Sequence, residues 1–330
     1  MKSRIVCLCL CTLLLAGLFG CAANSPQASE TSLHIVTTIF PLYDWTREIL
    51  GSEADHAQLD LLLASGVDMH SFQPTAADIV DIATCDVFLY VGGESDKWVE
   101  DALRQNANPN RIVLDLMDVL GDAVQEEELV EGMEAEQGDR DEHDEPAYDE
   151  HIWLSIKNAI VLCDRIAQAL ETADPAHTAV YKANAAAYIE KLQALDAAYA
   201  EAAANAAYTT LLFGDRFPFR YLTEDYGLSY YAAFVGCSAE TEASFETIVF
   251  LANKLDELRL PVILQLESAD GSIAETVRKA TQSQSQTILT LDSLQSVTAA
   301  DIKAGATYLG AMEQNLTVLR QALGAASNTI

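Results

Sequence analysis

Four side chains in this sequence are of types that bind a transition-metal ion. His70 follows the apolar run QLDLLLA, His151 precedes the segment IWLS, and Glu267 and Asp292 end the runs PVILQLE and TILTLD. Two imidazoles and two carboxylates are a donor set that suits Zn²⁺, with Mn²⁺ or Fe²⁺ as other candidates. Because no two of these residues are close in the sequence, such a site forms only when the chain folds.

Each of the four also has a purely structural interpretation. A histidine near the end of a strand can be a hydrogen-bonded loop residue, Glu267 can cap the turn that follows it, and Asp292 can be the N-cap of a turn in SLQS. The sequence contains no zinc finger, HExxH helix or EF-hand loop. Residue types and spacing therefore leave both interpretations open.

The composition favours a globular protein that attracts cations. The chain has 330 residues, of which 50% are hydrophobic, so it can bury the cores of two ordinary domains. Asp and Glu number 50 against 19 Lys and Arg, and the formal net charge is -31. Such a chain is unsuited to holding nucleic acid by counterion release, so we expect no nucleic-acid partner.

The elements that position the four residues alternate between short apolar runs and longer helical segments. We expect strands at 34–38, 58–64, 86–91 and 111–116, and again at 209–214, 229–234, 261–266 and 287–291. The predicted fold class is therefore α/β, with two lobes that each contain a parallel sheet flanked by helices and a cleft between the lobes. Ligands of such sheets bind beyond the carboxyl ends of the strands, which is why the polar residues that follow the predicted strands are the candidates for the site.

A long helix is predicted between the two series of strands. The segment 175–206 is rich in alanine and has no internal Gly or Pro, so we expect one rigid helix of about 30 residues that joins the lobes. Another helical segment is expected at 299–322. The predicted organisation is a signal peptide at 1–20, a tether at 21–32, an N-terminal lobe at 33–174, a linking helix at 175–207 and a C-terminal lobe at 208–330.

An acidic loop at 122–150 interrupts the N-terminal lobe. It contains fourteen Asp and Glu residues, the single base Arg140, and His143. This composition fits a segment that gathers cations near the cleft, and it fits a solvated tether equally well.

The N-terminus reads as a secretion signal. Lys2 and Arg4 precede an apolar run of 16 residues, IVCLCLCTLLLAGLFG, which is shorter than a membrane-spanning helix. The run ends at LFGC, which resembles the bacterial lipobox and implies a lipid on Cys21, with ordinary signal cleavage as the alternative. We expect a protein tethered outside the cytoplasmic membrane.

Three isolated cysteines remain, Cys85, Cys163 and Cys237, and we expect small buried hydrophobes there, with one disulfide as the alternative.

Six segments spread over nearly the whole mature chain resemble one protein family: IVTTIFPLYDW, SGVDMHSFQPTAADI, VGGESDKWVEDAL, DEHIWLS, FPFRYLTEDYGL and TLDSLQS. They look like the solute-binding lipoproteins of bacterial zinc and manganese ABC importers, and the zinc-specific group most of all. The resemblance implies two α/β lobes joined by a long helix, with the metal held between them. It also implies that His70, in HSFQP, and His151, before W-L, are ligands from the first lobe and that Asp292 is a ligand from the second.

The sequence departs from the family at one ligand. Where the family has a His or Glu five residues before the Tyr of an aromatic helix, this chain has Arg216, which stays protonated and cannot coordinate a metal. We expect Arg216 to pair with an acid, either Asp292 or Glu267. The site would then have three protein ligands and water, or would recruit Glu267 or Asp215, and we favour Glu267.

The resulting functional hypothesis is a monomeric, membrane-anchored receptor that captures Zn²⁺, or Mn²⁺, and delivers it to an ABC permease. It is not expected to be an enzyme. The alternative is an extracellular metal-dependent hydrolase that uses the same ligands, with Glu267 as general base. A surface adhesin of the same fold would carry the same motifs.

Overall fold

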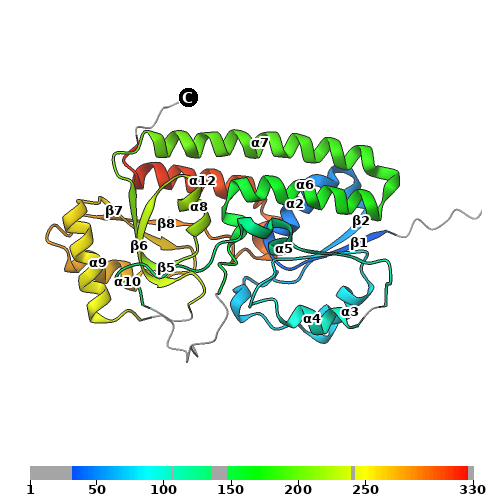
Figure 1. Ribbon diagram of the computed structural model, residues 1–330, viewed down its shortest axis with the longest axis horizontal. Helices are drawn as coiled ribbons and strands as arrows, with labels where there is room; N and C mark the ends of the chain where they lie inside the picture. Colours follow the sequence, from blue (N-terminus) through cyan, green and yellow to red (C-terminus); the bar gives the residue numbers. More distant parts are fainter. Residues whose placement is uncertain (1–31, 106, 135–146, 239–241, 326–330) are drawn as a thin grey trace, which may run out of the picture. The chain divides into compact units, whose positions relative to one another are not determined.

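The described residues of the computed structural model, 32–105, 107–134, 147–238 and 242–325, contain two four-stranded parallel sheets (Figure 1). The predicted signal peptide, Cys21, most of the tether and His143 lie outside these residues. The strands of the first sheet are β1 (Leu33–Thr37), β2 (Ala57–Leu61), β3 (Val87–Tyr90) and β4 (Ile112–Asp115). Those of the second are β5 (Thr210–Phe217), β6 (Ser229–Val235), β7 (Val262–Leu266) and β8 (Thr287–Leu291).

The two sheets have the same strand order. The first runs β2-β1-β3-β4 and the second β6-β5-β7-β8, and every pairing is parallel. Strands covered on both faces need continuous apolar runs, and the central strands provide them, with Val87–Leu89 and Leu211–Gly214 buried. The α/β fold class with two sheets flanked by helices is therefore confirmed.

The helices fill the intervals between the strands. In the first half they are α2 (Phe40–Leu50), α3 (Ala76–Thr84), α4 (Trp98–Leu103), α5 (Leu116–Leu120) and α6 (Ile156–Ala173). After the long helix α7 (Thr178–Ala204) come α8 (Arg220–Asp225), α9 (Phe245–Leu258), α10 (Ser272–Ala280), α11 (Ala299–Lys303) and α12 (Tyr308–Ala322). No helix in the described part of the chain is both long and apolar enough to cross a membrane.

The segment expected to be helical at 299–322 contains two helices. Helix α11 ends after five residues, and Gly305 has φ +100°, which a helix cannot accommodate. The Thr307 side chain then accepts a hydrogen bond from Gly310 N and so caps α12. The periodicity of the apolar residues continues across the break, which is why it did not reveal the interruption.

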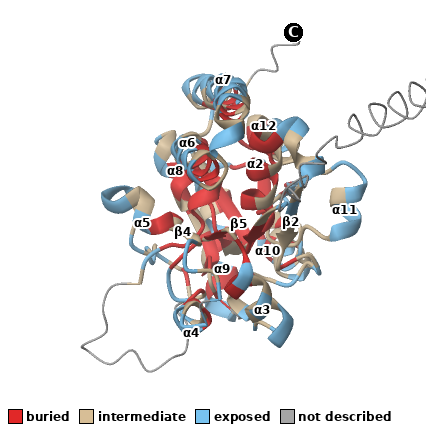
Figure 2. Cartoon of the chain, turned by 90° about the vertical axis from the view of Figure 1, so that its right-hand side faces the viewer, coloured by how far each residue is buried: buried red, intermediate tan, exposed pale blue. Residues whose placement is uncertain are grey.

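Helix α7 has 27 residues and packs against α2, α6 and α12 (Figure 1). Its buried side chains alternate at intervals of four and three residues: Tyr181, Ala185, Tyr188, Leu192, Leu195, Tyr199 and Ala202. That spacing forms one apolar stripe along the helix, and Figure 2 shows the opposite face exposed. Since residues 33–330 form one compact unit by their contacts, the lobe boundaries on either side of α7 stay a prediction.

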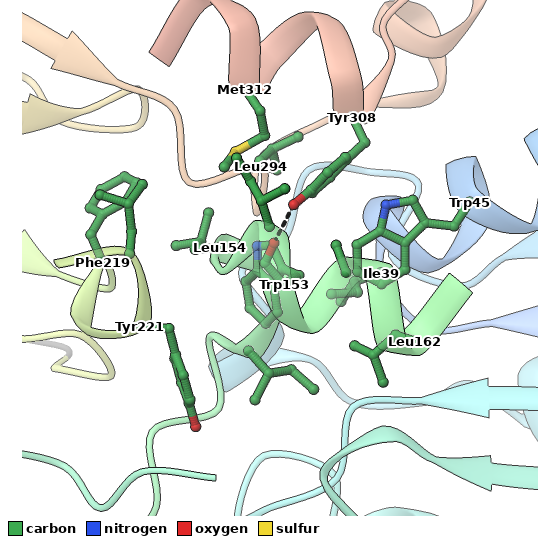
Figure 3. Packing of buried hydrophobic residues seen from close by; sticks show 14 of the residues in the cluster. Ile39, Trp45, Trp153, Leu154, Leu162, Phe219, Tyr221, Leu294, Tyr308 and Met312 are labelled. Carbon is green, nitrogen blue, oxygen red and sulfur yellow. Dashed lines mark hydrogen bonds between the residues drawn. The ribbon is translucent and has the colours of Figure 1, made fainter. Parts of the chain in front are cut away.

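A buried contact joins residues from both halves of the sequence beside α6. The hydroxyl of Tyr308 donates to the Trp153 carbonyl oxygen at 2.7 Å, the bond drawn in Figure 3, and Trp153 Nε1 donates to the Ser293 carbonyl at 2.9 Å. The rings of Trp45 and Tyr308 meet edge to face at 5.0 Å. These groups are fully or nearly fully buried, so they fix the short segment around Trp153.

We expect Tyr308→Phe to lower the free energy of unfolding by about 1–3 kcal/mol, because it removes the donor to a buried carbonyl. Urea unfolding measures the change. Tyr148→Phe, at an exposed tyrosine, is the control and is expected to change stability by less than about 0.5 kcal/mol. Equal stability of the two variants would contradict the role assigned to Tyr308.

Candidate metal centre

His70 lies in a single turn of 3₁₀-helix, Met69–Ser71, beyond the carboxyl end of β2. Asp68 caps this turn, and its Oδ1 accepts a hydrogen bond from His70 N at 3.1 Å. On the imidazole, Nδ1 lies 2.7 Å from Ser95 Oγ and 3.4 Å from Glu150 Oε2. These contacts orient the ring so that Nε2 is free to face another group.

His151 immediately precedes a second 3₁₀ turn, Ile152–Leu154, and its side chain is fully buried. Asp149 Oδ1 accepts a hydrogen bond from His151 N at 2.8 Å and lies 2.9 Å from Nδ1. An ionised carboxylate only accepts, so Nδ1 carries the proton and Nε2 presents its lone pair. Two residues further on, Trp153 fixes the chain through its hydrogen bonds with Tyr308 and with the Ser293 carbonyl.

The two Nε2 atoms lie 3.3 Å apart. A tetrahedral Zn²⁺ with bonds of about 2.0–2.1 Å to nitrogen separates two ligand nitrogens by about 3.3–3.4 Å. The distance therefore equals one edge of a zinc tetrahedron. A histidine whose other nitrogen is held by a carboxylate is also the usual arrangement around protein-bound zinc. The structure thus brings together the two predicted histidines in a geometry suited to one ion.

Acidic groups surround the two imidazoles. Burial lowers the pKa of His70, but the contact with Glu150 and the charge of Asp68 outweigh it, so the pKa lies above its ordinary value. Burial raises the pKa of Glu150, but its contacts with His70 and Ser95 outweigh this and hold the pKa below its usual range. A negative field of this kind favours a cation between the rings.

Cys237 is the third side chain at this point, and neither its spacing nor the family motifs predicted it. Among the described residues, one ring nitrogen of His70, one of His151 and the Cys237 sulfur all lie within 4.8 Å of one another. The expectation of a small buried hydrophobe is confirmed for Cys85 and Cys163, which are buried free thiols. Cys237 is a free thiol of intermediate exposure that lies two residues after the end of β6.

Arg216 does pair with an acid, but the partner is neither of the two expected. Its Nη1 lies 3.1 Å from Asp68 Oδ2 and 3.4 Å from the Ser238 carbonyl oxygen, so the expected pairing with Asp292 or Glu267 is wrong. The reason is spatial: Arg216 extends from β5 toward the turn that carries His70. Both Arg216 and Asp68 line a cavity of about 480 Å³.

Glu267 and Asp292 lie outside the three-residue cluster. Glu267 accepts hydrogen bonds from Ser293 N and Ser293 Oγ at 2.8 Å and from Ser296 Oγ at 3.0 Å. Asp292 Oδ1 accepts from Leu294 N at 2.8 Å. The contact of Asp292 is the cap expected of it, whereas Glu267 binds the segment after β8 and not the turn that follows it in the chain. The assignment of either carboxylate as a ligand stays a prediction.

Asp215, the other carboxylate considered, binds backbone groups of its own sheet. Its Oδ1 accepts from Arg216 N and its Oδ2 from Leu266 N. Burial raises its pKa in spite of these bonds. These bonds hold Asp215 within β5, at the irregularity in the pairing of β5 with β6, and its recruitment as a ligand stays a prediction.

Comparison with known proteins shows which family the chain belongs to. The family described as the periplasmic zinc-uptake complex component A, ZnuA, matches residues 35–322. The chain is 33% identical over 310 residues to the zinc-binding lipoprotein AdcA of Streptococcus pneumoniae, a match that covers 93% of this chain and 59% of AdcA. It thus spans about six tenths of that relative. It is 29% identical over 326 residues to the high-affinity zinc uptake system protein ZnuA of Bacillus subtilis, with 95% of each covered.

Solved structures show the same fold. The Zn(II)-bound ZnuA-like domain of Streptococcus pneumoniae AdcA is similar with a TM-score of 0.69 and 31% identity, over 88% of this chain and 99% of that domain. The metal-dependent lipoprotein YcdH from Bacillus subtilis is similar with a TM-score of 0.70 and 27% identity, over 88% and 99%.

Asp149→Asn is expected to weaken zinc binding by about 10- to 100-fold, because an amide orients the His151 ring less firmly and makes it less basic than a carboxylate does. Titration of the purified chain against a zinc chelator measures this. Asp164→Asn, on the exposed face of α6, removes the same charge away from the site and should leave the affinity unchanged. Equal losses in both variants would indicate a general charge effect.

Asp292→Asn is expected to stabilise the metal-free protein at pH 7. Burial, followed by the charge of Glu267, raises the pKa of Asp292 from 3.8 to about 6. The folded state therefore holds this proton more tightly than the unfolded state, so stability is lost as the pH rises from about 4 to 6, by about 3 kcal/mol. Urea unfolding at pH 4.5 and 7.5 should show a smaller pH dependence in the variant. An unchanged pH dependence would contradict this.

Proposed function

Because the chain belongs to the family of the periplasmic zinc-uptake complex component A, we propose that it captures Zn²⁺ outside the cytoplasmic membrane and delivers the ion to an ABC permease. The observation that carries the proposal is the separation of 3.3 Å between His70 Nε2 and His151 Nε2, with Nδ1 of each ring held by a polar partner. The names of the relatives, zinc-binding lipoprotein and zinc uptake protein, support the same cargo.

The site has properties that a carrier needs. The imidazoles are oriented before the ion arrives, so little ordering opposes binding. The side chain of His151 is fully buried and that of His70 is 13% exposed, so an ion bound between them would be shielded from solvent. This shielding limits the loss of the ion by exchange with water. In this proposal the ligands come from both halves of the sequence. A small movement of one half against the other then separates the ligands and releases the ion to the permease. Asp292 and Glu267 are proposed as carboxylates that take part in this exchange.

Attachment to the membrane is part of the proposal. The sequence LFGC implies a lipid on Cys21, and relatives of this chain are named lipoproteins. The tether 21–32 would let a monomeric receptor reach the permease in the same membrane.

No observation favours the hydrolase alternative. The relatives and solved structures reported above are metal-binding and zinc-uptake proteins. Glu267, the candidate general base, lies outside the three-residue cluster, and its carboxylate accepts three hydrogen bonds from serines.

His70→Ala and His151→Ala each remove a direct ligand and are expected to weaken Zn²⁺ binding by more than about 100-fold. Removing a residue that only orients a ligand typically weakens metal binding by about 10- to 100-fold, so the loss of the ligand itself should exceed that range. His56→Ala, at an exposed histidine, is the matched control and should bind like the original chain. Isothermal titration with Zn²⁺ and growth of an uptake-deficient strain at limiting zinc are the two measurements. Tight Zn²⁺ binding that is retained in both His70→Ala and His151→Ala would contradict the proposal.

A further inference from the structure

Cys237 is held against the two histidines by its neighbours in the chain. It follows β6 in the segment Gly236-Cys237-Ser238. A Cβ added at Gly236 would lie 2.9 Å from His151 Cε1 and 2.9 Å from the Phe217 carbonyl oxygen, closer than real Cβ atoms approach. Only glycine lets the chain pass this near to the His151 ring, and this close passage brings the sulfur of the next residue to the imidazoles.

The residue after Cys237 is fastened from the other side. Ser238 is buried, its N donates to the Val235 carbonyl at 3.2 Å, and its own carbonyl accepts from Arg216 Nη1 at 3.4 Å. Arg216 also contacts Asp68, which caps the turn that carries His70. One guanidinium therefore links the loop of Cys237 to the turn of His70. Arg216 cannot coordinate a metal, but here it positions two segments that can.

We propose that Cys237 is a direct ligand of the captured ion, so that the site is His₂Cys and prefers thiophilic ions such as Zn²⁺ to Mn²⁺. This inference rests on the proposed function and specifies its cargo. Arg216 stands where the family has a His or Glu ligand. In this proposal the thiolate of Cys237, from a neighbouring loop, supplies the third ligand instead.

The geometry requires only a small adjustment. With Zn–S of about 2.3 Å and Zn–N of about 2.0–2.1 Å, a tetrahedral ion places sulfur about 3.5 Å from each nitrogen. One ring nitrogen of each histidine and the Cys237 sulfur lie within 4.8 Å of one another, so each sulfur-to-nitrogen distance has to shorten by about 1.3 Å at most, and the two Nε2 atoms already have the spacing that the ion requires. On binding, the Zn–S bond forms, the S–H bond breaks, and the proton passes to solvent.

Ligand softness determines the selectivity. Thiolate is a soft donor that suits Zn²⁺, whereas Mn²⁺ prefers carboxylate, carbonyl and water oxygens. With two nitrogens and one sulfur, the site offers Mn²⁺ little of what it prefers. One exchangeable position remains for water or a carboxylate such as Asp292, through which the ion can be handed on.

The test compares the original chain with Cys237→Ser and Cys237→Asp, each loaded with Co²⁺ under reducing conditions. Cys85→Ser is the control, because Cys85 Sγ donates to the Ile82 carbonyl and a serine hydroxyl can do the same. We expect a sulfur-to-cobalt charge-transfer absorption in the original chain and in Cys85→Ser, and its loss in both Cys237 variants. Zn²⁺ affinity should fall about 10-fold or more in Cys237→Ser, and Cys237→Asp should bind Mn²⁺ better relative to Zn²⁺.

Alkylation of the thiol gives an independent measurement on the unchanged sequence. Zn²⁺ is expected to protect Cys237 from iodoacetamide, as read by peptide mass spectrometry. A charge-transfer band that persists in Cys237→Ser, or alkylation of Cys237 that goes to completion at the same rate with and without Zn²⁺, overturns the inference while leaving zinc capture by the histidines intact. Failure of the original chain to bind either Zn²⁺ or Co²⁺ overturns the proposed function itself, and this inference with it.

Discussion

The approach of His70 Nε2 to His151 Nε2 is the contact on which the account depends. Two imidazole lone pairs 3.3 Å apart repel each other unless a proton or a metal ion lies between them. The chain nevertheless holds them there, with Asp149 behind one ring and Ser95 behind the other. A metal ion that displaces the proton between the rings finds both nitrogens already at the spacing that it requires, so little ordering of the side chains opposes binding.

The remainder of the fold keeps these two rings in place. Trp153 follows His151 by two residues and is fixed by hydrogen bonds with Tyr308 and with the Ser293 carbonyl, so the second half of the sequence holds a ligand of the first. Helix α7 covers the elements behind this contact with one apolar stripe. Since packed interiors resist small displacements, the histidines are positioned by the core as well as by their own hydrogen bonds.

The sequence was sufficient to predict the two sheets, the long helix and the pairing of His70 with His151. Strand periodicity located all eight strands, although β2 ends three residues earlier and β5 three residues later than predicted, and the family motifs identified the two histidines. Cys237 was not predicted, because the sequence does not reveal that its loop passes within contact of His151. Nor does it show that Arg216 reaches Asp68. The break at Gly305 was missed because apolar spacing continues through it, while the positive φ belongs to the folded chain.

X-ray absorption spectroscopy at the zinc edge of the loaded protein tests the central claim most directly, since it counts the atoms bound to the ion. The account predicts two imidazole nitrogens at about 2.0–2.1 Å, identified by the outer scattering of their rings, and one sulfur at about 2.3 Å. A shell of oxygen atoms alone, without imidazole scattering, would contradict it.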